Sequence, residues 1–106
     1  MTRGECARLI VDKPLSIGET KDEKIHLCDV LQYDEKKECV YLRLQSSELT
    51  EISLDVVYSC EIGDEKDKIT CTGRARDRYN GRYGRTIKFQ IENGFYKINI
   101  KSLTNK

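Results

Sequence analysis

The alternation of apolar and polar residues along nearly the whole chain is the feature that most limits its fold. In CVYLRL (39–44), Val40, Leu42 and Leu44 fall on one face of an extended chain, and the residues between them fall on the other. A period of two residues is typical of strands with one buried face. The pattern therefore predicts an all-β protein.

Seven segments share this pattern, and each is expected to form a strand: 6–11, 24–33, 38–44, 56–62, 68–76, 86–91 and 95–100. Residues 46–55 are compatible with either a helical turn or a short extended cover. Seven short strands in up-and-down order favour a barrel, because closure removes exposed edges. We therefore predict one domain over residues 1–106, a small closed or split antiparallel β-barrel of six or seven strands with at most one short helical turn.

The same alternation predicts which side chains face the core. The expected inward sets are Ile25, Leu27, Leu31 and Tyr33; Val40, Leu42 and Leu44; Val56, Tyr58, Cys60 and Ile62; Ile69, Cys71, Gly73 and Ala75; and Ile87, Phe89 and Ile91.

Two Asn-Gly pairs predict hairpins, because this dipeptide favours tight turns. A two-residue turn at Asn93-Gly94 would pair Phe89 with Ile98, and both of these are apolar. A two-residue loop at Asn80-Gly81 would mix the inner and outer faces. We therefore expect a loop of odd length there, Asn80-Gly81-Arg82, with a bulge.

Composition restricts the class of protein. Of the 106 residues, 38% are hydrophobic and 35% are charged, which is typical of a well-solvated globular domain rather than of a disordered chain. No apolar stretch approaches the roughly 20 residues that span a bilayer. The N-terminal segment MTRGECARLIV lacks the long apolar region of a signal peptide. We therefore expect a cytoplasmic protein without a membrane partner.

The five cysteines could suggest a metal site or disulfide bonds. Their number is odd, no CxxC occurs, and the chain has a single histidine, His26. This pattern matches no common zinc site. The cysteines are therefore expected to be reduced thiols that behave as small, mostly buried hydrophobic side chains, and no metal or cofactor is predicted.

Charge is concentrated in one segment. Residues 73–88 carry a net charge of +5, whereas the whole chain carries +1, so the remainder carries −4. If Cys71, Gly73 and Ala75 face inward, the three arginines that alternate with them share the outer face. Arginine binds phosphate and carboxylate through a fixed fork of donors, and Tyr79 or Tyr83 could stack on a base. The candidate ligand-binding residues are Arg74, Arg76, Arg78, Arg82, Arg85 and Tyr79.

An equally weighted interpretation is a solvated strand face whose arginines pair with acidic neighbours such as Glu61 or Glu92. The sequence contains no paired catalytic acids, no glycine-rich phosphate loop and no Ser-His-Asp arrangement in a supporting context. A non-catalytic protein is therefore predicted.

The segments KIHLCDVLQYDEKKECVYLRL (24–44) and DVVYSCEIGDEKDKITCTGRARDRY (55–79) carry a resemblance at the level of pattern. Over residues 6–100 the chain resembles the small split barrel that precedes the cyclic-di-GMP-binding PilZ domain in flagellar-brake-type bacterial proteins. PilZ domains hold the dinucleotide through an RxxxR motif, which Arg74 and Arg78 formally satisfy, and through a later motif, Asp or Asn-x-Ser-x-x-Gly. The second motif is missing here, since NGRYG (80–84) has no serine, and the family's RxxxR precedes its first strand.

The resemblance implies a regulatory binding module of PilZ-like type that recognises a cyclic dinucleotide or an acidic protein partner. The alternatives are a small-barrel nucleic-acid-binding protein and a structural or assembly domain without a small ligand. A net charge of +1 counts against nucleic acid, because proteins that bind it usually carry a strongly basic surface.

Overall fold

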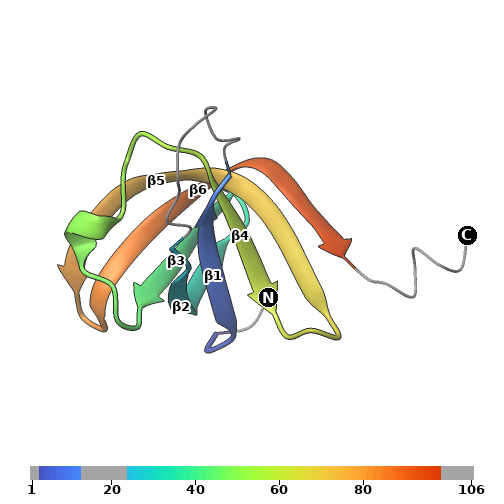
Figure 1. Ribbon diagram of the computed structural model, residues 1–106, viewed down its shortest axis with the longest axis horizontal. Coiled ribbons are helices and arrows are strands. Elements are labelled where there is room, and N and C mark those ends of the chain that lie inside the picture. The colour runs from blue at the N-terminus through green and yellow to red at the C-terminus, as the bar shows by residue number, and fades with distance from the viewer. Residues whose placement is uncertain (1–2, 13–23, 99–106) are drawn as a thin grey trace, which may run out of the picture.

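The strands of the computed structural model, which describes residues 3–12 and 24–98, close a six-stranded antiparallel barrel (Figure 1). The strands are β1 (Cys6–Val11), β2 (His26–Asp34), β3 (Cys39–Leu44), β4 (Tyr58–Gly63), β5 (Lys68–Gly81) and β6 (Gly84–Ile98). The predicted all-β barrel is therefore confirmed.

The barrel consists of two meanders of three strands each, β1-β2-β3 and β4-β5-β6. The meanders meet along two antiparallel seams, where β3 pairs with β6 and β1 pairs with β4. The predicted up-and-down order is wrong at one point, because the chain crosses from β3 to β4 instead of pairing them. The long connection between these strands has enough residues to make this crossing.

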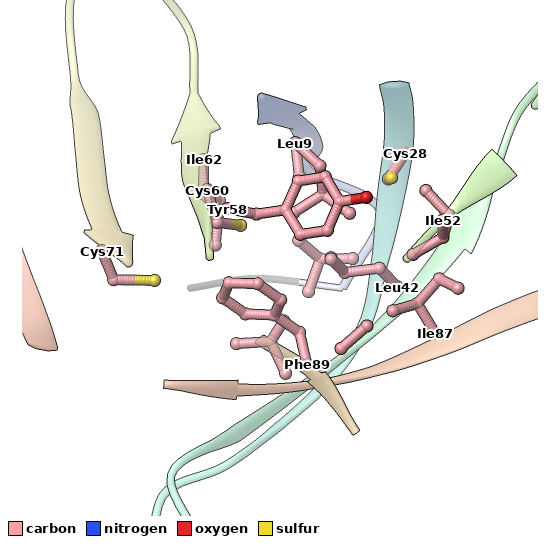
Figure 2. Close-up of a cluster of buried hydrophobic side chains, with 14 of the residues drawn as sticks. Leu9, Cys28, Leu42, Ile52, Tyr58, Cys60, Ile62, Cys71, Ile87 and Phe89 are labelled. Atoms are coloured by element: carbon pink, nitrogen blue, oxygen red, sulfur yellow. The ribbon is translucent and has the colours of Figure 1, made fainter. Parts of the chain in front are cut away.

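Residues 45–57 form this connection, which we call the crossover. It contains one 3₁₀ turn, η1 (Leu49–Glu51), followed by Ile52, whose side chain is completely buried. Figure 2 shows Ile52 in the same cluster as Leu42 and Ile87. The Ser53 amide donates to the Tyr58 hydroxyl at 2.9 Å, which ties the crossover to β4. The segment that the sequence left open is therefore a short helical turn with one buried apolar residue.

The core contains the side chains that alternation assigns to it in most strands. The buried residues that confirm the predicted faces are Val40, Leu42 and Leu44 in β3; Tyr58, Cys60 and Ile62 in β4; Cys71, Gly73 and Ala75 in β5; and Ile87, Phe89 and Ile91 in β6. Figure 2 shows the rings of Tyr58 and Phe89 within this cluster. Val56 and Ile69 are partly buried and pack against it.

The cysteines are free thiols, and four of the five are buried: Cys28, Cys39, Cys60 and Cys71. Burial raises the pKa of the Cys28 thiol to about 12, so this group stays protonated. Cys6 is exposed. The prediction that the cysteines are mostly buried is therefore confirmed, with Cys6 as the exception.

The inward face predicted for β2 is wrong for Ile25 and Leu27, whereas Tyr33 packs against the core as predicted. His26, Cys28 and Val30 are buried, whereas Ile25 and Leu27 are about half exposed. Both faces of this strand carry apolar residues, so alternation alone could not select between them. A bulge at Leu31 then shifts the register, since Val30 pairs with Leu42 but Gln32 pairs with Tyr41.

The last two predicted strands, 86–91 and 95–100, are joined in the single strand β6, so the hairpin predicted at Asn93-Gly94 is wrong. Beyond Ile91 the chain continues along β5, where Asn93 pairs with Thr72 and Tyr96 with Thr70. The register shifts on both sides of Thr72 are bulges. Glycine and asparagine suit bulges as well as turns, and the long β5 offers an unpaired edge on which β6 continues. Residues 99 and 100 lie outside the described range.

Among the described residues, no helix has the length and apolar character needed to cross a bilayer. The same residues contain no cluster of three or more His, Cys, Asp or Glu side chains arranged to hold a metal ion.

His26 connects the barrel interior to the crossover. Its Nδ1 lies 2.7 Å from the Ser47 hydroxyl, and its ring packs edge-on against Tyr58 with a centroid distance of 6.3 Å. Burial, followed by the charge of Lys24, holds the pKa of His26 below its usual value near 6.5 despite the opposing effect of Glu51. The folded protein therefore favours the neutral imidazole.

Gly73 provides the first test of the barrel geometry. A Cβ at this position would lie 1.9 Å from the Gln90 carbonyl oxygen, so Gly73→Ala forces β5 and β6 apart. We expect a loss of about 2 kcal/mol in the free energy of unfolding, measured by chemical denaturation. Gly94→Ala is the matched control, because nothing lies within 4 Å of a Cβ there. Equal losses in the two variants would contradict the close packing of β5 on β6.

His26 predicts a pH dependence of stability. Since its pKa is lower in the folded than in the unfolded chain, the unfolded state binds the extra proton as the pH falls below about 6.5. The free energy of unfolding should therefore decrease between pH 7 and pH 5. In His26→Gln this decrease should be absent from equilibrium denaturation curves over the same interval. If the free energy of unfolding of the variant decreases with pH as in the wild type, another group causes the pH dependence.

Candidate functional site

The candidate site is built on the hairpin of β5 and β6. Gly81 pairs with Gly84, so the turn consists of Arg82 and Tyr83, and Gly84 leaves it with φ of +116°, a conformation that favours glycine. The predicted three-residue loop Asn80-Gly81-Arg82 is therefore wrong. A two-residue turn alone would pair inward residues of β5 with outward residues of β6. One additional residue in β5, away from the turn, corrects this mismatch.

That extra residue is Arg76, which forms a bulge in β5. Ala75 pairs with Phe89 and Asp77 pairs with Lys88, so Arg76 has no partner on β6. Before the bulge the odd-numbered residues of β5 face the core, and after it the even-numbered residues do. The inner face of β5 consequently meets the inner face of β6 from Gly73 to the turn.

The bulge turns Arg78 inward. Arg78 pairs with the completely buried Ile87, so its side chain lies on the inner side of the hairpin, beside the crossover. Its guanidinium donates to the carbonyl oxygen of Leu49 at 3.3 Å and to that of Ile52. The prediction that Arg74, Arg76 and Arg78 share one outer face is wrong, because Arg78 stabilises the crossover.

Arg85 lies on the same side of the hairpin as Arg78, since its position pairs with Asn80. It donates to the Gln45 carbonyl oxygen at 3.4 Å, at the start of the crossover. Two of the predicted ligand-binding arginines therefore hold backbone carbonyls of this chain.

The remaining arginines of β5 lie elsewhere. Arg74 Nε is 3.1 Å from the Glu92 carboxylate, an ion-pair distance without the direction of a hydrogen bond. This is the acidic neighbour that the alternative interpretation of the sequence proposed. Arg76 is exposed at the bulge.

The outer surface of the barrel carries two rows of cross-strand neighbours next to the hairpin. One row consists of Asp29, Arg43, Thr86 and Tyr79, and the other of Gln32, Tyr41, Lys88 and Asp77. Directly opposed residues on neighbouring strands point to the same face of the sheet. Tyr79 belongs to the outer surface only because the bulge precedes it.

Over these rows lies a groove with two adjoining hollows. The first hollow, of about 300 Å³, is lined by Leu31, Tyr41, Tyr79, Arg82, Tyr83 and Arg3, among others. The second, of about 380 Å³, shares Arg3, Leu31 and Tyr83 with the first and continues to Asp29 and Arg43. We call the two together the tyrosine-arginine groove.

The N-terminal segment forms one wall of the groove. The Gly4 amide donates to the Val30 carbonyl at 2.7 Å, and the Val30 amide donates to the Glu5 carbonyl at 2.9 Å. These bonds fix the backbone beside Arg3, whose guanidinium carbon lies 4.8 Å from the centre of the Tyr83 ring. The N-terminal segment and the tip of the hairpin therefore meet across the groove.

Tyr83 is surrounded by positive charge. In addition to Arg3, the Arg82 guanidinium carbon lies 6.0 Å from the centre of its ring. Hydrogen bonding from Arg3, and then from Arg82, holds the pKa of the Tyr83 phenol below its usual value. None of the described residues that line the first hollow is acidic. This hollow therefore favours a negatively charged group.

The second hollow is closer to neutral. Asp29 accepts from the Arg43 guanidinium, and it also accepts from Gln45 Nε2 at 2.9 Å. The hydrogen bond from Arg43 is the main cause that lowers the pKa of Asp29. The negative charge of the Asp29 carboxylate and the positive charge of the Arg43 guanidinium therefore largely cancel.

Of the six residues predicted to bind a ligand, the structure brings Tyr79 and Arg82 into the groove. Arg74, Arg76, Arg78 and Arg85 lie outside it. No local pattern in the sequence places Arg3, Leu31 or Tyr41 at the site, because only the closed barrel brings the N-terminal segment and β2 beside the hairpin. Tyr83, which the sequence indicates as a stacking residue, lines both hollows of the groove.

Comparison of the chain with protein-family models, with curated proteins and with solved structures gave no match. Its candidate site is therefore defined by geometry and charge.

The structural role of Arg78 can be tested against its exposed neighbour. Arg78→Ala removes both hydrogen bonds to the crossover and leaves two carbonyls to be solvated, at a cost of about 1–3 kcal/mol in the free energy of unfolding. Arg76→Ala deletes the same charge at the bulge and should change this free energy by less than about 0.5 kcal/mol. Thermal and urea denaturation of both variants would measure the difference, and equal stabilities would contradict the inward position of Arg78.

Proposed function

We propose that this chain is a non-catalytic binding module and that the tyrosine-arginine groove binds an anionic ligand with a planar ring, of the nucleotide class. One observation carries the proposal: the first hollow combines Arg3 and Arg82 with three tyrosines and has no acidic residue in its lining.

The two kinds of side chain suit the two parts of a nucleotide. The guanidinium donors of Arg3 and Arg82 can hold a phosphate, and arginine does this through paired hydrogen bonds. Tyr79 and Tyr83 are 38% and 45% exposed. Because Arg3 and Arg82 already lie over the Tyr83 ring, Tyr79 is the residue on which a base would stack most directly. Stacking of a base on an aromatic side chain contributes about 1–3 kcal/mol.

A regulatory role is proposed from the PilZ-like resemblance, and it needs one revision. The arginines that match RxxxR, Arg74 and Arg78, are held by Glu92 and by the crossover carbonyls. They would have to leave these partners to contact a cyclic dinucleotide. We therefore propose that any nucleotide ligand contacts Tyr79, Tyr83 and the arginines beside them.

An acidic partner protein could also contact Arg3 and Arg82, and it would not require the tyrosine rings. The exposed aromatic faces favour the ligand with a ring. The two possibilities separate in a binding experiment, because only one of them depends on the tyrosines.

The test is calorimetric titration with nucleoside phosphates, cyclic dinucleotides and short oligonucleotides, with an acidic peptide in parallel. We expect one of the nucleotide ligands to bind, and Tyr79→Ala to weaken it about 5- to 150-fold, the range that corresponds to one stacked base. The acidic peptide should bind more weakly and respond less to this change.

Arg82→Ala and Arg76→Ala form a matched pair, since each removes one positive charge from the same hairpin. Arg82→Ala should weaken binding at least tenfold, and Arg76→Ala by less than twofold. Equal effects would mean that the ligand responds to net charge and not to the groove. Failure of every nucleotide ligand to bind would overturn the proposal.

A further inference from the structure

We infer that the tyrosine-arginine groove holds two successive nucleotides of a linear single-stranded nucleic acid, with the phosphodiester between them at Arg3. This inference rests on the proposed function and specifies the ligand. It depends on three features of the groove: its division into two hollows, the one cationic side chain that lines both of them, and the chemistry of the residues that line each hollow.

The division limits how much of a ligand each part can hold. The hollows have volumes of about 300 and 380 Å³. These values lie at the low end of the range for small-molecule sites, which is about 300–1,000 Å³. Each hollow therefore suits a group of the size of one nucleotide, and the pair suits two in succession.

The shared side chains lie where the link between two nucleotides would pass. Arg3, Leu31 and Tyr83 line both hollows. Arg3 is the only cation among these three. The hydrogen bonds that the Gly4 and Val30 amides donate fix the backbone next to it beside β2. A single shared guanidinium matches the single phosphodiester of a linear dinucleotide.

Each floor offers contacts for one base. In the first hollow, Tyr41 and Tyr79 provide aromatic surface and Gln32 provides an amide that can both donate and accept. In the second hollow, Leu31 provides apolar surface, and the paired side chains of Asp29 and Arg43 provide an acceptor and donors. Arg82 lies in the first hollow only, where it can hold a terminal or flanking phosphate.

A linear strand fits this arrangement better than a cyclic dinucleotide. A cyclic dinucleotide has two phosphodiesters that join the same two nucleosides, and pairing both of them with cations would take two positive side chains between its bases. The groove presents one there. A linear strand can also leave the groove at both ends, which is possible because the groove lies on the open outer surface of the barrel.

The test is a length series of 5′-phosphorylated thymidylates, from one to four nucleotides, with the matching uridylates and a cyclic dinucleotide in parallel. Affinity should rise at least tenfold from one nucleotide to two, and less than about threefold from two to four. The full chain is used, and binding is followed by fluorescence anisotropy of a labelled tetranucleotide in competition with each unlabelled ligand.

Two variants locate the phosphodiester. Arg3→Gln should reduce the gain from one to two nucleotides to less than about threefold, whereas Arg76→Gln, with the same change in charge outside the groove, should preserve it. With two phosphates held, the logarithm of the affinity for the dinucleotide should fall with the logarithm of salt concentration with a slope of about −1.4.

The outcomes separate the two proposals. If a mononucleotide binds as tightly as the dinucleotide, or the cyclic dinucleotide binds more tightly than the linear one, the two-nucleotide inference is wrong and the nucleotide-binding module stands. An unchanged length dependence in Arg3→Gln overturns the role of Arg3. If none of these ligands binds, the proposed nucleotide-binding function is wrong as well.

Discussion

The bulge at Arg76 is the constraint on which the candidate site depends. Its single extra residue reverses the faces of β5 between Ala75 and the turn, so that Arg78 points inward and Tyr79 points outward. If Arg76 were instead paired with Lys88 in a regular register, Arg78 would take the place of Tyr79 opposite Thr86 on the outer surface. The crossover would then lose the guanidinium that holds its carbonyls. One local change in backbone register therefore links the stability of the crossover to the composition of the groove.

The closed barrel determines that the groove lies on the outside. The interior is filled by completely buried side chains, including the rings of Tyr58 and Phe89, and Ile52 of the crossover packs into the same core. Interiors of small barrels are filled by side chains and leave little room for a ligand. Surface that can bind a ligand is consequently provided by the outward residues of β2, β3, β5 and β6. The long β5–β6 hairpin and the N-terminal segment add walls to this surface.

Alternation predicted the barrel and the inner faces of β3, β4 and β6 because each of these strands has one clearly apolar face. It could not assign β2, where Leu27 and Val30 lie on opposite faces and both are apolar. Nor could it locate the bulges at Leu31 and Arg76, because a bulge depends on pairing with a neighbouring strand.

The candidate site could be predicted only in part for the same reason. Arg82 and Tyr79 could be found from local charge and aromatic content, but Arg3 joins them only through the closure of the barrel. Charge segregation in residues 73–88 indicated the correct hairpin, although four of its arginines lie outside the groove.

The most direct test of this account is a titration of the ¹⁵N-labelled chain with a short single-stranded oligonucleotide, followed by amide and arginine side-chain NMR signals. The account predicts that the largest changes occur at Arg3, Leu31, Tyr41, Tyr79, Arg82 and Tyr83. The side-chain signals of Arg78 and Arg85 should change little, because these groups remain bound to the crossover. Changes that centre on Arg74, Arg76 and Arg78, with the groove unaffected, would contradict it.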